Sequence, residues 1–140
     1  MSRGTSLPRW RFSLPTGFAS LARNRPRWDQ PAARFQFVEG DTELLPGLEL
    51  IETSGHTLGH QSVVVRLPKT GAVLLAIDAV GAERFFSADR EKHPYDEDEA
   101  AARASTLKLM DLAQREGAMV VFGHDTEQWQ TLRLAPDFYE

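Results

Sequence analysis

Three short apolar runs in this chain each lead to a residue of a type that binds metal ions in proteins. The end of a β-strand is held in place by its neighbours, so three such ends in one sheet can direct their side chains to one point. Imidazole nitrogens and carboxylate oxygens suit zinc, iron, manganese or cobalt. The three runs and their ligand-type residues are Leu48–Ile51 with His56, Leu74–Ile77 with Asp78, and Val120–Phe122 with His124.

The runs belong to an alternation of strands with one long helix, which predicts an α/β fold. The β-branched stretch Val63–Val65 marks a strong strand, and Gly117 is a typical residue to end a helix. Asp96 is predicted to cap the start of that helix, with Glu99 as its reciprocal partner. The predicted strands are Arg34–Val38, Leu48–Glu52, Gln61–Leu67, Ala72–Ile77 and Ala118–Phe122, and the predicted helix is Asp96–Glu116.

Five short motifs follow one another between residues 35 and 140. Each motif alone carries little information, whereas their combination in this order is specific. They are Glu39-Gly40-Asp41, Leu45-Pro46-Gly47-Leu48, Gly55-His56-Thr57 with Gln61-Ser62, Leu75-Ala76-Ile77-Asp78-Ala79, and Phe122-Gly123-His124-Asp125 with Glu127-Gln128.

Taken together, these motifs resemble the metallo-β-lactamase superfamily, and within it the N-acyl homoserine lactonase family. The resemblance implies an αββα sandwich made of two αβ halves, with residues 35–140 as the C-terminal half. It also implies that His56 and His124 each bind one metal ion and that Asp78 bridges the two. The expected cofactor is zinc or another divalent transition metal, two ions in complete relatives and at most one here.

The remaining ligands of that family are not found in this sequence. They lie in a His-x-His-x-Asp-His block upstream of the matching motifs, whereas the histidines here are His56, His60, His93 and His124. We therefore interpret the chain as a truncated metallohydrolase whose activity alone is impaired. A second interpretation stays open, in which the chain is a non-catalytic scaffold or dimerisation module with a vestigial metal site.

The candidate residues also have ordinary structural interpretations. A histidine at a strand end, such as His56, is usually hydrogen-bonded and structural. Asp78 either binds a cation, because an unpaired buried carboxylate is costly, or caps a loop by accepting backbone amides. By resemblance His60 is a structural histidine beside the site. Asp125 either orients a ligand or supports the turn that follows His124.

The resemblance implies a lactone as substrate. In such enzymes two cations share a hydroxide that attacks the lactone carbonyl, and one cation stabilises the oxyanion. In several lactonases a tyrosine three residues after the bridging aspartate contacts the substrate, and here that position is Gly81. Hydrolysis of a thioester, as in the glyoxalase II type, is an alternative within the same fold.

The first 34 residues differ in charge from the rest of the chain. They hold seven arginines and one acidic residue, although the whole chain has a net charge of −4. The segment is open to interpretation as a transit peptide, an arm that binds nucleic acid or an anionic surface, or a solvated lead-in to the fold. We expect the lead-in, with a domain boundary between residues 34 and 35, and the resemblance implies that in a full-length relative this stretch would help to wall the substrate pocket.

Composition and patterning narrow the possible environments and partners. Hydrophobic residues make up 41% of the chain, and no apolar run approaches the roughly 20 residues of a membrane helix. The chain has no cysteine, which excludes disulfides. We expect a cytoplasmic protein without a nucleic-acid or membrane partner. The strands are apolar on both faces and the helix covers one, so we expect self-association or a complementary N-terminal half.

Overall fold

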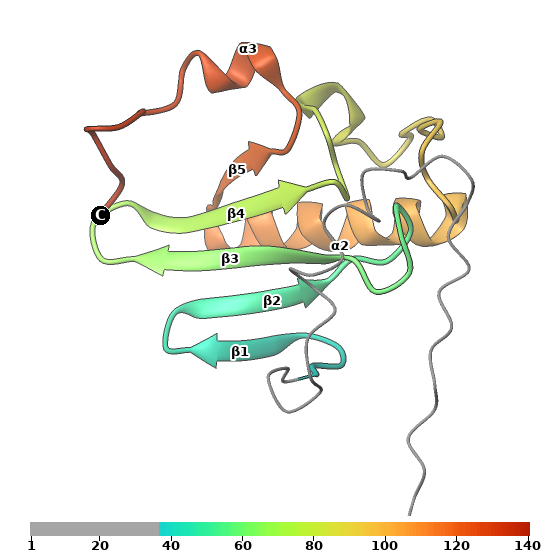
Figure 1. The fold of residues 1–140 in the computed structure, drawn as a ribbon, viewed down its shortest axis with the longest axis horizontal. Helices are drawn as coiled ribbons and strands as arrows, with labels where there is room; N and C mark the ends of the chain where they lie inside the picture. The colour runs from blue at the N-terminus through green and yellow to red at the C-terminus, as the bar shows by residue number, and fades with distance from the viewer. Residues whose placement is uncertain (1–36) are drawn as a thin grey trace, which may run out of the picture. The chain divides into compact units, whose positions relative to one another are not determined.

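The described part of the chain folds as a mixed five-stranded β-sheet with one long helix packed on it (Figure 1). The computed structural model describes residues 37–140. The strands lie across the sheet in chain order, antiparallel except for the last pair, which is parallel. The elements are β1 (Thr42–Leu45), β2 (Leu48–Glu52), β3 (Gln61–Leu67), β4 (Gly71–Ile77), η2 (Glu83–Phe85), α2 (Glu99–Glu116), β5 (Met119–Phe122) and α3 (Thr126–Trp129).

The predicted α/β fold class is confirmed, and β2 to β5 lie where the apolar runs predicted them. Of the strand expected at Arg34–Val38, only residues 37 and 38 are described, and they are not in a strand. β2 and β3 have the expected bounds, while β4 begins one residue earlier and β5 one residue later than expected. The turn between β1 and β2 passes through Gly47, whose φ of 81° lies in the left-handed region that favours glycine. The Pro46-Gly47 pair therefore closes the first hairpin, and β1 extends the sheet by one strand.

Helix α2 begins at a different aspartate from the one predicted. Its N-cap is Asp98, whose side chain accepts a hydrogen bond from the backbone N–H of Ala101 (3.0 Å). The capping pair expected between Asp96 and Glu99 is therefore wrong. Asp96 is instead buried and paired with a side chain of the preceding loop. The other end agrees with the sequence, because Gly117 ends the helix in the left-handed conformation with φ 61°.

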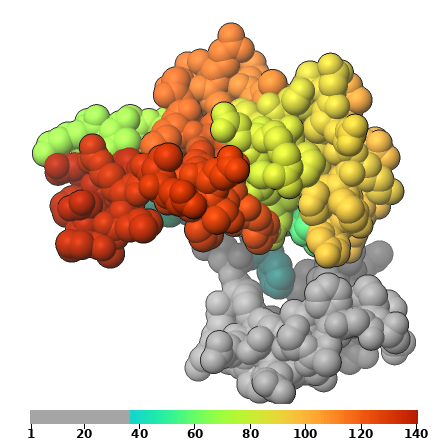
Figure 2. All heavy atoms as spheres, turned by 90° about the horizontal axis from the view of Figure 1, so that it is seen from above, coloured from blue at the N-terminus to red at the C-terminus, as the bar shows by residue number. Residues whose placement is uncertain are grey.

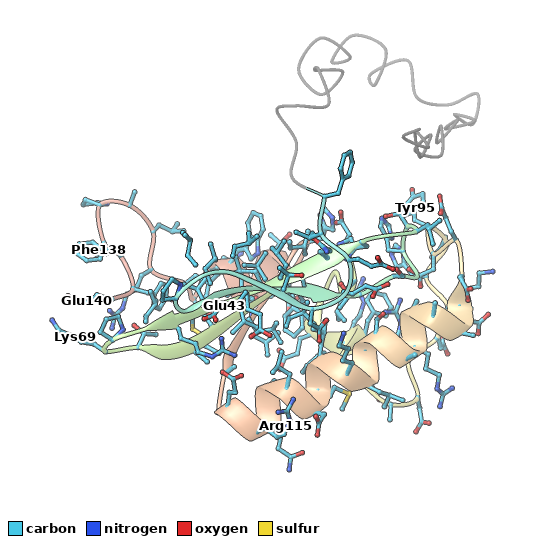
Figure 3. All side chains as sticks on the ribbon, turned by 90° about the horizontal axis from the view of Figure 1, so that it is seen from below. Glu43, Lys69, Tyr95, Arg115, Phe138 and Glu140 are labelled. Atoms are coloured by element: carbon cyan, nitrogen blue, oxygen red, sulfur yellow. The ribbon has the colours of Figure 1, made fainter. Side chains whose placement is uncertain are left out.

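The two faces of the sheet have different surroundings. Ile51, Val64 and Leu74 lie on the face toward α2 and form the core with Leu109 and Leu112 of that helix. Figures 1 and 3 show the helix lying across this face. The opposite face carries apolar residues that are half-buried, among them the paired sets Leu50 with Val63 and Val63 with Leu75.

The strand directions bring three strand ends to one edge of the sheet. β2 and β4 run in the same direction because each is antiparallel to β3, and β5 is parallel to β4. The segments that follow these three strands therefore leave from the same edge. This arrangement confirms the expectation that His56, Asp78 and His124 lie after strand ends of a single sheet.

The arginine-rich segment 1–34 and the boundary expected after it lie outside the described residues. Within residues 37–140, no helix has the length and apolar character needed to cross a membrane.

Candidate functional site

Asp78 and His124 meet at the ends of the parallel pair β4 and β5. Nε2 of His124 lies 2.7 Å from Oδ1 of Asp78, and both side chains reach solvent, with exposed fractions of 74% and 38%. The backbone N–H of His124 donates to the carbonyl oxygen of Gly81 (2.7 Å), which fixes the end of β5 against the segment after β4. A hydrogen-bonding nitrogen and a carboxylate oxygen are thus presented together at the sheet edge.

The local backbone explains how these two side chains come so close. Ile77 has a φ of 54°, a rare conformation for a β-branched residue, and it turns the chain sharply just before Asp78. A Cβ atom on Gly123 would lie 2.4 Å from the carbonyl oxygen of Ile77. Only glycine can therefore stand before His124 while the two strand ends keep this approach.

Asp78 is not the buried carboxylate that the sequence predicted. Its side chain is 38% exposed because the turn at Ile77 directs it out of the apolar strand. The pairing with His124 thus satisfies a carboxylate that also has access to water.

Among residues 37–140, His56 does not complete a group of three potential metal ligands with Asp78 and His124. Its nearest charged partner is Asp96, with 3.6 Å between Nδ1 of His56 and Oδ1 of the aspartate. The rings of His56 and His60 are in edge contact, with centroids 6.3 Å apart.

His60 lies immediately before β3. It is held by a series of hydrogen bonds in which each group donates to the next. The backbone N–H of Asp78 donates to Nε2 of His60 (3.3 Å), so the ring proton is on Nδ1. Nδ1 then donates to Oγ1 of Thr53 (2.8 Å), Thr53 donates to Oγ of Ser62 (3.0 Å), and Ser62 donates to the carbonyl of Ala76 (3.1 Å). Burial lowers the pKa of the His60 imidazole, which favours this neutral form.

Asp125 secures the turn after His124. Its Oδ1 accepts from the backbone N–H of Gln128 (3.0 Å) as the N-cap of α3, and its Oδ2 accepts from the N–H of Glu83 (2.8 Å). These backbone hydrogen bonds lower the pKa of the Asp125 carboxyl group. Of the two roles considered for Asp125, these contacts correspond to support of the turn.

His124 and Asp125 also line an open hollow on the surface. Its other walls come from Ala82–Arg84 and from Thr126–Gln128. Figure 2 shows the C-terminal segment in red against the yellow-green segment that follows β4. At Gly81, beside this hollow, an added Cβ would lie 3.6 Å from Cδ2 of His124, an ordinary contact distance.

Two donors fit part of a metal site. Asp78 and His124 offer a carboxylate oxygen and an imidazole nitrogen side by side, a donor set suited to divalent transition metals. Among residues 37–140, no group of three or more His, Asp or Glu residues is close enough to hold a metal ion. The described residues therefore present two ligand-type side chains in contact, and His56 does not complete a group of three with them.

A buried ion pair next to His56 was not identified from the sequence. Arg90 and Asp96 pair inside the loop before α2, with side-chain exposures of 4% and 1%. The sequence offers only an arginine six residues before an aspartate in a charged loop, and such spacing predicts no contact. The pair follows from tertiary packing against α2.

Comparison with known proteins gives relatives over most of the chain. No family model matches it. An N-acyl homoserine lactonase of Bacillus sp. is 35% identical over 108 residues, which cover 77% of this chain and 42% of the relative. The N-acyl homoserine lactonase AttM of Azorhizobium caulinodans is 35% identical over 136 residues, which cover 90% of this chain and 50% of the relative.

Solved structures of N-acyl homoserine lactone hydrolases are also similar to this chain. An N-acyl homoserine lactone hydrolase with N-hexanoyl-L-homoserine bound at its catalytic metal centre superposes with a TM-score of 0.68 at 34% identity. The match covers 74% of this chain and 41% of that one. The chain has the metallo-β-lactamase fold. Its similarity is to the N-acyl homoserine lactonases, of whose length it spans half or less.

Solved structures with lower sequence identity share the fold alone. The dizinc quorum-quenching lactonase AidC superposes with a TM-score of 0.54 at 18% identity, over 68% of this chain and 32% of that one. The common α/β architecture therefore extends beyond the lactonases of similar sequence.

Proposed function

We propose that this chain supplies ligands to the divalent metal site of a lactone-opening hydrolase. The observation that carries the proposal is the contact between Nε2 of His124 and Oδ1 of Asp78 at the ends of two adjacent strands. The similarity to N-acyl homoserine lactonases supports it, as does the product bound at the metal centre of one solved relative. His56 is the third proposed ligand.

When bound, a divalent cation acts as a Lewis acid and activates water near neutral pH, which is what opening a lactone requires. The chain's own residues hold and orient the donors. Gly123 allows the two strand ends to approach, and the hydrogen-bonded chain from His60 fixes the backbone at Asp78. Gly81 presents no side chain to a substrate, so any lactone is oriented by other groups.

Two donors in contact do not complete a site, because zinc in proteins usually has three or four protein ligands. We propose that further donors come from a polypeptide with a His-x-His-x-Asp-His block, and that this chain alone hydrolyses lactones little or not at all. Zinc or another divalent transition metal is the proposed cofactor, at most one ion per isolated chain.

The test is complementation. The purified chain is mixed with the N-terminal part of a related lactonase and zinc, and ring opening of an N-acyl homoserine lactone is followed by the acid released. We expect the mixture to exceed either part alone, and His124→Ala to abolish the gain. His93→Ala is the matched control, because that ring contacts Phe85 and Tyr95 away from the pair. Chelator-sensitive turnover by the isolated chain contradicts the proposal.

A non-catalytic scaffold is the second candidate. It is favoured by the finding that residues 37–140 hold no cluster of three potential ligands. Zinc analysis after dialysis separates the two candidates. We expect less than one ion per chain and still less in His124→Ala, whereas a chain that retains no zinc in either form supports the scaffold.

A further inference from the structure

The carboxylate of Asp96 is buried but only half of it is hydrogen-bonded. Its Oδ2 accepts from the guanidinium of Arg90 and from the backbone N–H of His93 (3.1 Å). Its Oδ1 is buried without a hydrogen-bond partner and lies 3.6 Å from Nδ1 of His56. An unsatisfied buried carboxylate oxygen is costly, so the nearest available donor determines what this oxygen does.

The backbone holds His56 next to this oxygen. The N–H groups of Glu97 and Asp98 donate to the carbonyl oxygens of His56 (3.3 Å) and Gly55 (2.9 Å). Gly55 has a φ of 137°, and a Cβ there would lie 2.2 Å from the backbone nitrogen of Ala102. The loop after β2 is thereby fixed against the start of α2, and the distance between His56 and Asp96 is set by main-chain contacts.

Arg90 links the same carboxylate to the strand end that carries Asp78. Its Nη1 donates to the carbonyl oxygen of Ala79 (2.7 Å) and to Oγ1 of Thr106 (2.9 Å), while Nη2 donates to Asp96. The Asp96 carboxylate is therefore held at Oδ2 by Arg90 and by the backbone N–H of His93, and Arg90 is itself fixed by its other two partners. Its free oxygen is directed by this frame rather than by its own side-chain rotation.

We propose that Asp96 is the positioning residue of His56, holding its imidazole with the proton on Nδ1 and leaving Nε2 as the nitrogen available to a metal ion. A carboxylate on one ring nitrogen is a common means of fixing the tautomer and orientation of a histidine ligand. The role as a ligand rests on the proposed function. The tautomer itself does not, because the contact exists in the chain without a metal.

The tautomer is measured on the metal-free, ¹⁵N-labelled chain by long-range ¹H–¹⁵N correlation at pH 8, where a neutral imidazole dominates. We expect His56 as the Nδ1–H form, and His60 serves as an internal standard for that form. In Asp96→Asn the amide can donate to Nδ1, so we expect a shift toward Nε2–H. Asp89→Asn is the matched control, since Asp89 lies in the same loop with its side chain 95% exposed.

An Nε2–H form of His56 in the unaltered chain overturns the proposal, and this measurement needs no variant to fold. The same tautomer in Asp96→Asn as in the unaltered chain also overturns it. Zinc titration then tests the ligand role separately. We expect zinc affinity to fall about tenfold in Asp96→Asn and to be unchanged in Asp89→Asn. A tautomer shift with no change in affinity leaves the positioning intact and removes His56 from the proposed metal site.

Discussion

Single glycines decide where the ligand-type side chains can lie. Gly123 precedes His124 in the chain and Gly81 accepts a hydrogen bond from the His124 N–H, but the two glycines differ in the space around them. At Gly123 an added Cβ would lie 2.4 Å from a backbone carbonyl, whereas at Gly81 it would lie 3.6 Å from the nearest side-chain atom. The first glycine is required by the approach of two strand ends, and the second is open to substitution.

Gly123→Ala is therefore expected to lower the free energy of unfolding by about 2 kcal/mol or more, because β5 must move away from Ile77. Gly81→Ala is expected to change it by less than about 0.5 kcal/mol. Urea titrations of the two variants measure the difference. Equal stability of the two would show that the strand ends separate at little cost.

The sequence predicted the Asp78–His124 contact because each residue follows an apolar run, and parallel strand ends meet at one edge. It also predicted that His56 follows a strand end of the same sheet, and the role of His56 as a ligand stays a prediction. The role of Asp96 was missed because its contact with His56 depends on the packing of a loop against α2.

At the scale of elements, Arg66 joins two strands and the helix. From β3 its guanidinium donates to Glu49 of β2 (2.8 Å) and, through Nη2 (2.6 Å) and Nε (2.8 Å), to Glu116 of α2. These hydrogen bonds raise the pKa of Arg66 and lower that of Glu116 below its usual value of 4.5. These three side chains fix the C-terminal end of α2 against β2 and β3, although they remain partly exposed to solvent.

Glu116→Gln is expected to reduce the free energy of unfolding by less than about 1 kcal/mol at neutral pH and low salt, since solvent screens exposed pairs. The folded-state pKa of Glu116 is lowered, so its contribution is complete above about pH 4.5 and is lost as the pH falls through the folded pKa. Thermal unfolding of both forms between pH 7 and pH 4 measures the difference in stability between the unaltered chain and Glu116→Gln. A difference that grows as the pH falls contradicts the lowered pKa of Glu116.

Element types were predictable from the sequence, whereas one boundary was not. The β-branched and apolar runs gave β2 to β5, and Gly117 gave the end of α2. The start of α2 lies among four consecutive acidic residues, of which Asp96 and Asp98 are both good N-caps. Asp96 pairs with Arg90 and therefore does not cap the helix. The sequence does not predict this pairing because it is a tertiary contact.

At the scale of the whole molecule, the sheet has a second apolar face. Leu48, Leu50, Val63, Val65 and Leu75 are half-buried on the side away from α2. Apolar area of this kind favours association by roughly 25 cal/mol per Å² removed from water. The expectation of self-association or of a complementary half therefore remains a prediction tied to this face.

Light scattering of the purified chain at micromolar concentration is expected to give a dimer or larger assembly. Val63→Lys should shift the population toward the monomer, since a charge at the centre of such a contact is costly. Lys92→Ala, at an exposed loop position, serves as the control. A stable monomer in the unaltered chain would contradict the prediction.

The parallel pairing of β4 with β5 also has a consequence for the order of folding. β1 to β4 are joined by short connections and pair with the strand next in the chain, so they can assemble by local steps. β5 joins only after residues 78–118 have folded back, and its ladder with β4 is short and interrupted between Leu75 and Ile77. We therefore expect amide protons of β5 to exchange with deuterium faster than those of β3. The Asp78–His124 pair then forms in the last stage of assembly and opens in the first stage of unfolding.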